Sequence, residues 1–386
     1  MKKESIRLRS LSVTATFILL VGACSLISLL TPDRRLSETE NRALEQRPKL
    51  SAESLLSGEF TEKYELYMSD QFFLRDKWVA LRNYSEIALM KREINGVYIA
   101  DDGYLIAKPD ADSDAMNENA GHIRAFAERC ADDLGIGHIR VLIAPTALTV
   151  LSEKLPPFTE ADDRTSFLTA LADALPEGSF CDALPVLEEH DDEYIYYRTD
   201  HHWTTLGAYY AYTAYCGSIG DEPVPVGEFR QIIASDSFEG TLASKVNIDV
   251  KEDELRIFER LDGRKATAEY DMKPSTAGSS LYNLSALETK DKYSVFLDGN
   301  RPIVDITSDT DNGRTLMVIK DSYANCFVPF LTEHYGRVIV IDLRYFNADV
   351  LDFGASQGVT DMLVLYNTEA LATDGNIQKL GRAAVK

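Results

Sequence analysis

The segment Asp200-His201-His202-Trp203 brings a carboxylate and two imidazoles together within three positions. It holds two of the six histidines and one of the two tryptophans, a density that favours a functional site over a helix cap beside structural histidines. Side chains alternate along an extended segment, so Asp200 and His202 are predicted to lie side by side while His201 faces the other way. A carboxylate beside an imidazole fixes its tautomer and stabilises the imidazolium that forms when the ring takes a proton.

A second reactive segment is KDSYAN at residues 320–325, which follows an apolar run and opens a predicted helix. Ser322 would then lie at a helix N-terminus, where free N–H groups and the helix dipole favour negative charge. That position suits an activated hydroxyl and the oxyanion of acyl transfer. Asp and Ser are also common helix caps, so the segment gains weight only beside an Asp-x-His pair. Together the two segments supply a nucleophile, a base and an orienting carboxylate.

A metal site is the competing interpretation of Asp200, His201 and His202. Adjacent histidines rarely converge on one metal ion, and the sequence has neither an H-E-x-x-H motif nor a clear further ligand. We therefore expect no metal site and no cofactor.

The elements that must position these residues follow from the apolar patterns. Buried strands are predicted at 138–145, 314–320, 337–343 and 361–367, and helices at 114–134, 164–175, 205–216, 322–335 and 347–355. Strands that alternate with helices predict an α/β fold with a doubly wound, mostly parallel sheet. A strand-like run at 194–198 precedes Asp200 and another at 314–320 precedes Ser322, so both segments fall where such sheets place ligands.

The chain is predicted to have three parts. Residues 1–32 form a cytoplasmic tip and a membrane helix, and 33–94 form a linker with an amphipathic helical stretch at 61–92. The catalytic domain spans 95–386 and opens with a hairpin at 95–108 around an Asp-Asp-Gly turn. Short strands and many turns at about 228–305 predict a β-rich insertion in that domain.

The N-terminus predicts the location of the protein. Residues 10–32 carry no charge and would form a helix of about 35 Å, enough to cross a bilayer. The basic residues before it favour a signal-anchor with a cytoplasmic N-terminus and the rest of the chain outside the cell membrane. Lipidation at Cys24, within a Val-Gly-Ala-Cys sequence, and a cleaved signal peptide are the alternatives. All three place the body of the protein outside the cytoplasmic membrane, and the signal-anchor predicts a location in the bacterial cell envelope.

Composition narrows the class of partner. The 386 residues carry a net charge of −22, which repels phosphate backbones and disfavours nucleic-acid binding. The five cysteines form no C-x-x-C pair, so a zinc-ribbon or thioredoxin-type site is not expected. We expect them to act as small buried hydrophobic residues, with the disulfide state left open.

The sequence TDHHWTTLGAYYAY (199–212) resembles the signature of the DHHW protein family. It is also similar to the Asp-x-His-Trp motif of the alginate O-acetylation proteins, which have an SGNH-hydrolase-like fold. Further resembling blocks run from about residue 37 to 367: SETENRALEQRP (37–48), DQFFLRD (70–76), NGVYIADDGYL (95–105), FEGTLASK (238–245), LDGNRP (297–302), IKDSYANCFVPFL (319–331) and IDLRYFN (341–347). The order, with Asp-x-His before the serine, is permuted relative to common SGNH esterases.

The resemblance implies roles for particular residues. Ser322 would attack an acyl donor, His202 would act as general base and Asp200 would orient it. Arg344 would help to hold the oxyanion. The further candidates for contact with substrate or oxyanion are Asn325, Trp203, Tyr366 and Asn367, and ordinary loop polarity is the alternative for the last two. In such systems a membrane-bound O-acyltransferase is thought to supply the acyl group.

Three functions fit these features. The first is transfer of acetyl groups to a cell-surface or secreted polysaccharide, and the second is removal of acyl groups by an esterase with the same triad. The third is non-catalytic polysaccharide binding, which paired tyrosines would suit, although aromatic residues more often belong to the core. The sequence leaves the polymer, the acyl group and the oligomeric state open.

Overall fold

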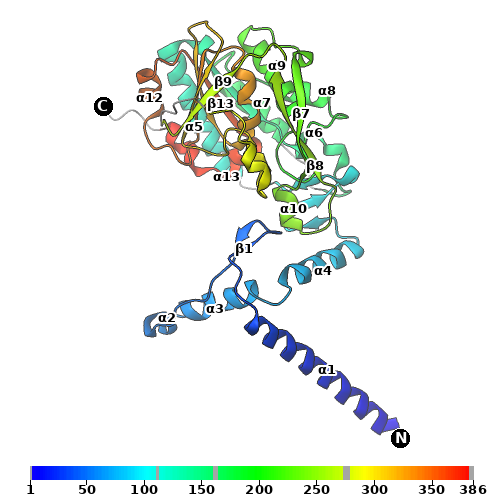
Figure 1. The fold of residues 1–386 in the computed structure, drawn as a ribbon. Coiled ribbons are helices and arrows are strands. Elements are labelled where there is room, and N and C mark those ends of the chain that lie inside the picture. The colour runs from blue at the N-terminus through cyan, green and yellow to red at the C-terminus, as the bar shows by residue number, and fades with distance from the viewer. Residues whose placement is uncertain (1, 110–112, 160–163, 273–278, 382–386) are drawn as a thin grey trace. The chain divides into compact units, whose positions relative to one another are not determined.

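The computed structural model describes residues 2–109, 113–159, 164–272 and 279–381 (Figure 1). The chain divides into two compact units. The first contains the residues up to Lys91 together with Ser244–Asp249, and the second contains Arg92–Ala243 and the chain from Val250 onward.

The second unit is built on a mixed six-stranded sheet in the order β6-β13-β11-β12-β10-β9. Its strands are β6 (Ile139–Ala144), β9 (Ala266–Tyr270), β10 (Ile303–Ser308), β11 (Thr315–Lys320), β12 (Arg337–Ile341) and β13 (Asp361–Asn367). β6, β13, β11 and β12 run parallel, whereas β10 and β9 pair antiparallel at one edge. The fold is therefore α/β, and its four parallel strands coincide with the four predicted from apolar runs.

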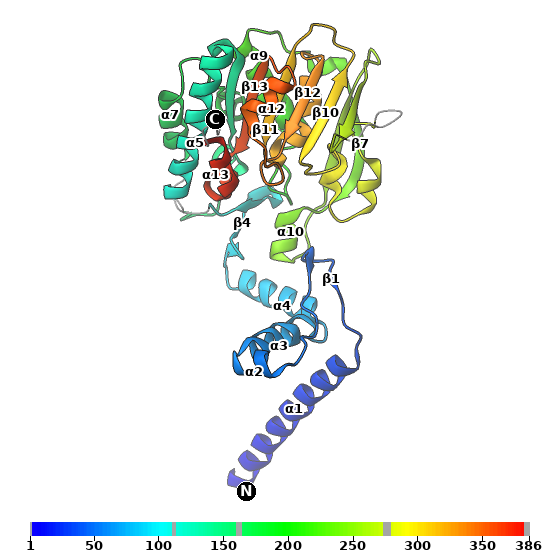
Figure 2. The same ribbon diagram turned by 90° about the vertical axis from the view of Figure 1, so that its left-hand side faces the viewer.

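Side chains alternate along the central strands and bury both faces of this sheet. Leu316 and Val318 of β11 face one hydrophobic cluster, and Met317 and Ile319 face the other. The first cluster includes α8 (Leu184–Glu189), α9 (Thr205–Ile219) and α11 (Val328–Leu331), and the second includes α5 (Ser113–Leu134), α7 (Arg164–Ala174), α12 (Val350–Ser356) and α13 (Thr368–Thr373) (Figure 2). Strands buried on both faces read as continuous apolar runs, which is why the sequence revealed them.

Three predicted elements differ from the structure. The helix predicted at 322–335 is a short 3₁₀ turn, Ser322–Cys326, followed by α11, which restarts with Pro329 in its first turn. The run 194–198 is no strand of the sheet, because only an isolated bridge joins Tyr196 to Trp203. Its aromatic residues are buried in the first cluster, which gave them a strand-like pattern. The helix predicted from 347 begins at Val350, where Asp349 caps it.

The region 228–305 contributes to two sheets. β7 (Phe229–Phe238) and β8 (Asp253–Arg260) pair in a separate antiparallel sheet, and α10 (Thr241–Val246) lies between them in the sequence. β9 and β10 instead extend the main sheet, so this region is not wholly an insertion. The antiparallel edge escaped prediction because its strands are short and only half buried.

A three-stranded sheet of β3 (Glu93–Ile94), β4 (Val97–Ile99) and β5 (Leu105–Ala107) contains the predicted hairpin. Asp102 and Gly103 at its turn have φ values of 57° and 78°, in the left-handed region that an Asp-Gly turn favours. Helix α6 (Ala147–Val150) also belongs to the second unit.

The first unit is mostly helical. It contains α1 (Lys2–Leu30), the paired strands β1 (Leu36–Ser37) and β2 (Arg42–Ala43), and helices α2 (Ala52–Leu56), α3 (Glu59–Asp70) and α4 (Arg75–Ala88). The stretch predicted as one helix at 61–92 is broken before α4, where Leu74 has a φ of 55°. Within the described residues, one helical segment, Ser10–Leu30, is long and apolar enough to cross a membrane, with a mean hydropathy of 2.3.

Ion pairs in this unit join the segment 37–48 to the segment 70–76. Arg42 holds Asp70 through two nitrogens at 2.5 and 2.9 Å, and Arg75 binds Glu40 at 2.7 Å. Asp70 also accepts the backbone N–H of Glu45 at 2.9 Å. The E-N-R and D-Q-F-F-L-R-D sequences therefore share a structural role, since a fork of Arg on a carboxylate fixes both partners in direction.

Helix α9 packs closely on the segment that carries the Asp-x-His motif, which a pair of glycine substitutions tests. A Cβ at Gly207 would lie 2.3 Å from the carbonyl oxygen of Ile195, whereas one at Gly217 on the same helix would meet open space. We expect Gly207→Ala to lower the free energy of unfolding by about 1–3 kcal/mol through overpacking. Gly217→Ala should raise it by about 0.5–1 kcal/mol, because alanine favours a helix over glycine. Urea unfolding measures both; equal effects would contradict this packing.

Candidate active site

The loop before α9 is held in place by backbone bonds and by one buried carboxylate. The Tyr197 N–H donates to the His202 carbonyl at 3.2 Å, which closes the loop around the motif. Asp253 of β8 accepts from the backbone N–H of Arg198 at 3.0 Å and of Thr199 at 2.8 Å, and from the Thr199 hydroxyl at 2.6 Å. Asp253 is fully buried, and a buried carboxylate without hydrogen-bond partners would destabilise the fold. These bonds therefore fix the position of the loop.

Asp200, His202 and Ser322 form one line of hydrogen bonds, which we call the triad. Asp200 Oδ1 lies 2.5 Å from His202 Nδ1, and His202 Nε2 lies 2.8 Å from Ser322 Oγ. Because an ionised carboxylate only accepts, the ring proton lies on Nδ1 and Nε2 is free to accept from the serine hydroxyl. This is the geometry by which an imidazole takes the proton of an attacking serine.

Asp200 is held ionised although it is buried. Burial alone would raise the pKa of Asp200, but the imidazoles of His201 and His202 and the hydrogen bonds it accepts hold that pKa below its ordinary value. The Thr241 backbone N–H and hydroxyl donate to Oδ2 at 2.8 and 3.1 Å. Gly240 makes room for the carboxylate, because a Cβ there would lie 2.2 Å from the Asp200 Cβ.

Tyr293 supports the other two members of the triad. Its ring stacks on the His202 imidazole, with centroids 3.8 Å apart and planes 12° from parallel. Its hydroxyl donates to the Ser322 carbonyl oxygen at 3.2 Å. Asp200 and His202 are buried, whereas Ser322 is half-buried, so the serine is the most exposed residue of the triad.

The sequence did not identify Asp253, Gly240, Thr241 or Tyr293. Gly240 and Thr241 lie inside the segment FEGTLASK, which resembles the family but did not indicate what either residue does. Asp253 and Tyr293 carry no local signal, because their partners lie 54 and 29 positions away along the chain.

His201 does not face away from His202, in contrast to the prediction. The two imidazole centroids lie 3.9 Å apart, and His201 Nδ1 lies 2.8 Å from the Thr241 hydroxyl. The reason is that residues 198–202 bend rather than extend, so the alternation of side chains does not apply. Asp200 and His202 still meet, because the Asp200 carboxylate also accepts the His202 backbone N–H at 3.1 Å.

Asp200, His201 and His202 offer ligand atoms within 4.8 Å of one another, so the metal interpretation has a geometric basis among the described residues. Both ring nitrogens of His202 already have protein partners, however. A metal ion on His202 would displace either Asp200 or Ser322. The hydrogen-bond pattern therefore favours the triad.

The ends of neighbouring parallel strands gather around Ser322. Asp321 joins β11 to β13, since its Oδ2 accepts the Asn367 backbone N–H at 2.6 Å and the side-chain Nδ2 at 2.7 Å. Burial raises the pKa of Asp321. The other carboxylate oxygen of Asp321, Oδ1, accepts the Tyr323 N–H. The Ser322 N–H has no partner among the described residues.

Arg344 follows the end of β12, next to β11. Its Nε and Nη2 bind Asp342 at 2.9 and 2.5 Å, and its Nη1 has no partner within the described chain. Lys320 Nζ approaches the same carboxylate at 3.5 Å and donates to Asn325 Oδ1 at 2.8 Å. Burial lowers the pKa of Lys320 to about 8. Ser322 N–H and Arg344 Nη1 are thus two donors at this edge of the sheet that have no partner among the described residues.

The other predicted contact residues are buried beneath the triad. Trp203 donates from Nε1 to the Tyr323 carbonyl at 2.9 Å, and Asn325 is engaged by Lys320. Asn367 is tied to Asp321 and caps α13, and Tyr366 is fully buried in the second cluster. All four side chains are buried, so the structure does not place them on an exposed surface.

The fold and the site together define an α/β protein with a buried Asp-His pair that reaches a half-exposed serine. The model of the DHHW protein family matches residues 139–341, more than half of the chain. This chain belongs to the DHHW protein family. The match includes Asp200, His202 and Ser322.

Solved structures share the fold. A DHHW family protein from Eubacterium siraeum is 28% identical, with a TM-score of 0.62 over 75% of this chain and 95% of that one. Bacillus cereus PatB1 with a sulfonyl adduct is 19% identical, with a TM-score of 0.62 over 75% and 99% of the two chains. A second PatB1 structure is 20% identical, with a TM-score of 0.59 over 70% and 95%. Among the curated proteins, the sequence finds no match.

The close approach of Gly240 to Asp200 generates a prediction. Gly240→Ala should push the carboxylate away from His202 and abolish the downfield proton resonance that a short carboxylate–imidazole hydrogen bond produces. Gly137→Ala is the control, because a Cβ there would meet open space. Proton NMR of both variants, with Asp200→Asn to assign the resonance, makes the comparison. An unchanged resonance in Gly240→Ala would show that the carboxylate does not need this space.

Proposed function

We propose that this protein is an SGNH-hydrolase-like acyltransferase that moves acetyl groups onto hydroxyls of a cell-surface or secreted polysaccharide. The observation that carries the proposal is the unbroken hydrogen-bond line from Asp200 through His202 to Ser322. The mixed sheet with helices on both faces supports a doubly wound arrangement of the SGNH type.

In the first half-reaction Ser322 Oγ attacks the carbonyl carbon of the acyl donor, and its proton passes to His202 Nε2. Asp200 stabilises the imidazolium that results. The Ser322 N–H and Arg344 Nη1 are the donors proposed to stabilise the oxyanion, since neither has another partner in the described chain. Collapse of the intermediate releases the donor alcohol, which takes the proton back from His202 and leaves an acyl-serine.

In the second half-reaction His202 removes the proton from a sugar hydroxyl, which attacks the acyl-serine. The new ester leaves, and the proton returns to Ser322 Oγ. An esterase would follow the same steps with water as the acceptor, so the alternative differs only in what reaches the acyl-serine.

The apolar helix Ser10–Leu30 supports a tethered protein. We propose that residues 1–32 include a signal-anchor, that 33–94 connect it to the catalytic domain, and that 95–386 act outside the cell membrane. A membrane-bound O-acyltransferase is then the proposed acyl donor, because a tether keeps Ser322 within reach of a donor in the same membrane. Bacillus cereus PatB1, which has a similar fold, was solved with a sulfonyl adduct, and this supports the presence of a reactive nucleophile in proteins of this fold.

Replacement of the proposed nucleophile tests the function. The protein lacking residues 1–32 would be incubated with a chromogenic acetyl ester, with and without an oligosaccharide acceptor. Ser322→Ala should lower the rate of ester cleavage by about 10³-fold or more, because the covalent route is lost. Ser356→Ala, at the exposed end of α12, is the matched control and should retain the full rate.

The products distinguish the two enzymatic functions. Ser322-dependent acetylation of the oligosaccharide would support transfer, and release of acetate alone would support the esterase. Equal rates for Ser322→Ala and the parent protein would refute both.

A further inference from the structure

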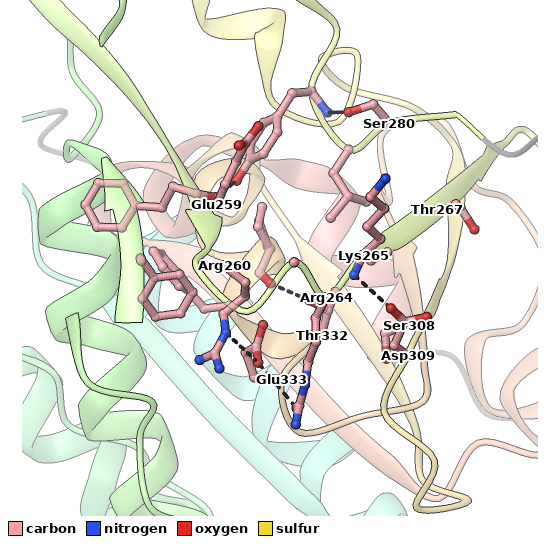
Figure 3. Close-up of a pocket in the computed structure, with 18 of the residues that line it drawn as sticks. Glu259, Arg260, Arg264, Lys265, Thr267, Ser280, Ser308, Asp309, Thr332 and Glu333 are labelled. Atoms are coloured by element: carbon pink, nitrogen blue, oxygen red, sulfur yellow. Dashed lines mark hydrogen bonds and ion pairs between the residues drawn. The ribbon is translucent and has the colours of Figure 1, made fainter. Parts of the chain in front are cut away.

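A second site lies at the opposite end of the sheet from Ser322. A cavity of about 590 Å³ opens between the β7–β8 sheet, the start of β9 and the residues after α11 (Figure 3). Ser308, which ends β10, and Thr310, which follows that strand, line the cavity, and this end of β10 is in register with the start of β12. Ser322 follows the opposite end of β11, and the six residues of that strand span roughly 20 Å. The cavity is therefore distinct from the triad.

Three cationic side chains line this cavity with donors that the described residues leave unused. The Arg264 guanidinium has no hydrogen-bond partner among the residues that the structure describes, and the carboxylate oxygens nearest to it there lie 3.4 and 3.9 Å away. Lys265 Nζ has neither an ion-pair nor a hydrogen-bond partner in the described chain. Arg260 Nη1 is buried and finds no hydrogen-bond partner in the described parts of the chain.

A buried carboxylate keeps the arginines at the cavity wall. Glu333 Oε2 lies 3.7 Å from Arg260 Nε and 3.9 Å from Arg264 Nη1, and Figure 3 shows Glu333 between the two side chains. Its side chain is 6% exposed, and this oxygen accepts no hydrogen bond. Burial raises the pKa of Glu333. Arg260 Nη2 also donates to Asp262 at 2.6 Å, so a hydrogen bond anchors Arg260, whereas the Arg264 guanidinium is held by charge at a distance.

Other acidic groups at the cavity are already engaged. Glu259 is paired with Arg230 at 2.5 Å, and Asp309 accepts the Lys265 backbone N–H at 2.9 Å. Asp262, which lies between Arg260 and Arg264 in the chain, is paired with Arg260 at 2.6 Å. With these acidic groups engaged, the side-chain donors of Arg264 and Lys265 are the groups available to a bound anion.

The cavity also has an aromatic wall. Phe229 and Phe258 line it from the β7–β8 sheet, and Arg260 lies over the Phe229 ring at 5.4 Å. Tyr282 lines it with a half-buried ring whose hydroxyl is fixed to the Phe258 carbonyl at 2.7 Å. A rigid ring beside charged donors suits a sugar ring that carries an acidic group.

We propose that this cavity binds an acidic sugar unit, with Arg264 and Lys265 contacting its carboxylate or phosphate group. Guanidinium favours both groups because its fork matches their paired oxygens. This inference rests on the polysaccharide part of the proposed function and deepens it, since the cavity would hold the acceptor polymer away from the hydroxyl that Ser322 acylates.

Binding by the Ser322→Ala protein tests the site without turnover. Isothermal titration at low salt would use three probes: an oligogalacturonate, a phosphodiester-linked glycan oligomer and a neutral cello-oligosaccharide. The double variant Arg264→Gln/Lys265→Gln should weaken binding of one acidic probe tenfold or more. Both residues are exposed, so the fold should persist. Arg124→Gln/Lys251→Gln removes the same charge elsewhere on the exposed surface and should change affinity less than twofold.

The probes identify the source of the anion, since uronate and phosphate are tested separately. Equal weakening by the two double variants would mean diffuse attraction and would overturn the proposal. Absence of saturable binding by both acidic probes, or preference for the neutral one, would overturn it as well. Because Ser322→Ala cannot turn over, these results are independent of ester cleavage, and either conclusion can fail while the other stands.

Discussion

The buried hydrogen bond between Asp200 and His202 is the interaction on which the rest of the site depends. A carboxylate removed from water is costly unless hydrogen bonds and opposite charge replace its solvation. Here Thr241 supplies two donors, His202 Nδ1 supplies a third, and Gly240 leaves the space that the carboxylate fills. The proton is thereby fixed on Nδ1, and the other ring nitrogen is turned toward the serine.

This pair must meet a serine 120 positions later in the chain. The sheet achieves that by setting Ser322 directly after a strand buried on both faces, where the backbone has little freedom. Asp253 does the same for the loop that carries Asp200. Tyr293 then joins the two sides, because its ring supports His202 and its hydroxyl holds the serine backbone.

Patterns with short-range causes could be predicted from the sequence. The four parallel strands were predicted because burial on both faces makes them continuous apolar runs, and the hairpin was predicted from its Asp-Gly turn. The pairing of Asp200 with His202 was anticipated, although a bend rather than an extended segment produces it. His201 was misplaced for the same reason.

Features with long-range causes could not be predicted. The helix expected after Ser322 is instead a 3₁₀ turn that ends at Cys326, followed by the separate helix α11. The aromatic run at 194–198 is a buried loop, since burial in the core and burial in a strand give the same local pattern. Gly240, Asp253 and Tyr293 acquire their roles only through contacts that the fold creates.

Covalent labelling of the serine tests the central claim most directly. The protein would be treated with an aryl sulfonyl fluoride and examined by intact and peptide mass spectrometry, beside His202→Ala. If the triad activates Ser322, a single sulfonyl adduct will form on the peptide that contains it, and His202→Ala will form far less. A parent protein without an adduct, or an equal adduct in His202→Ala, would contradict the account.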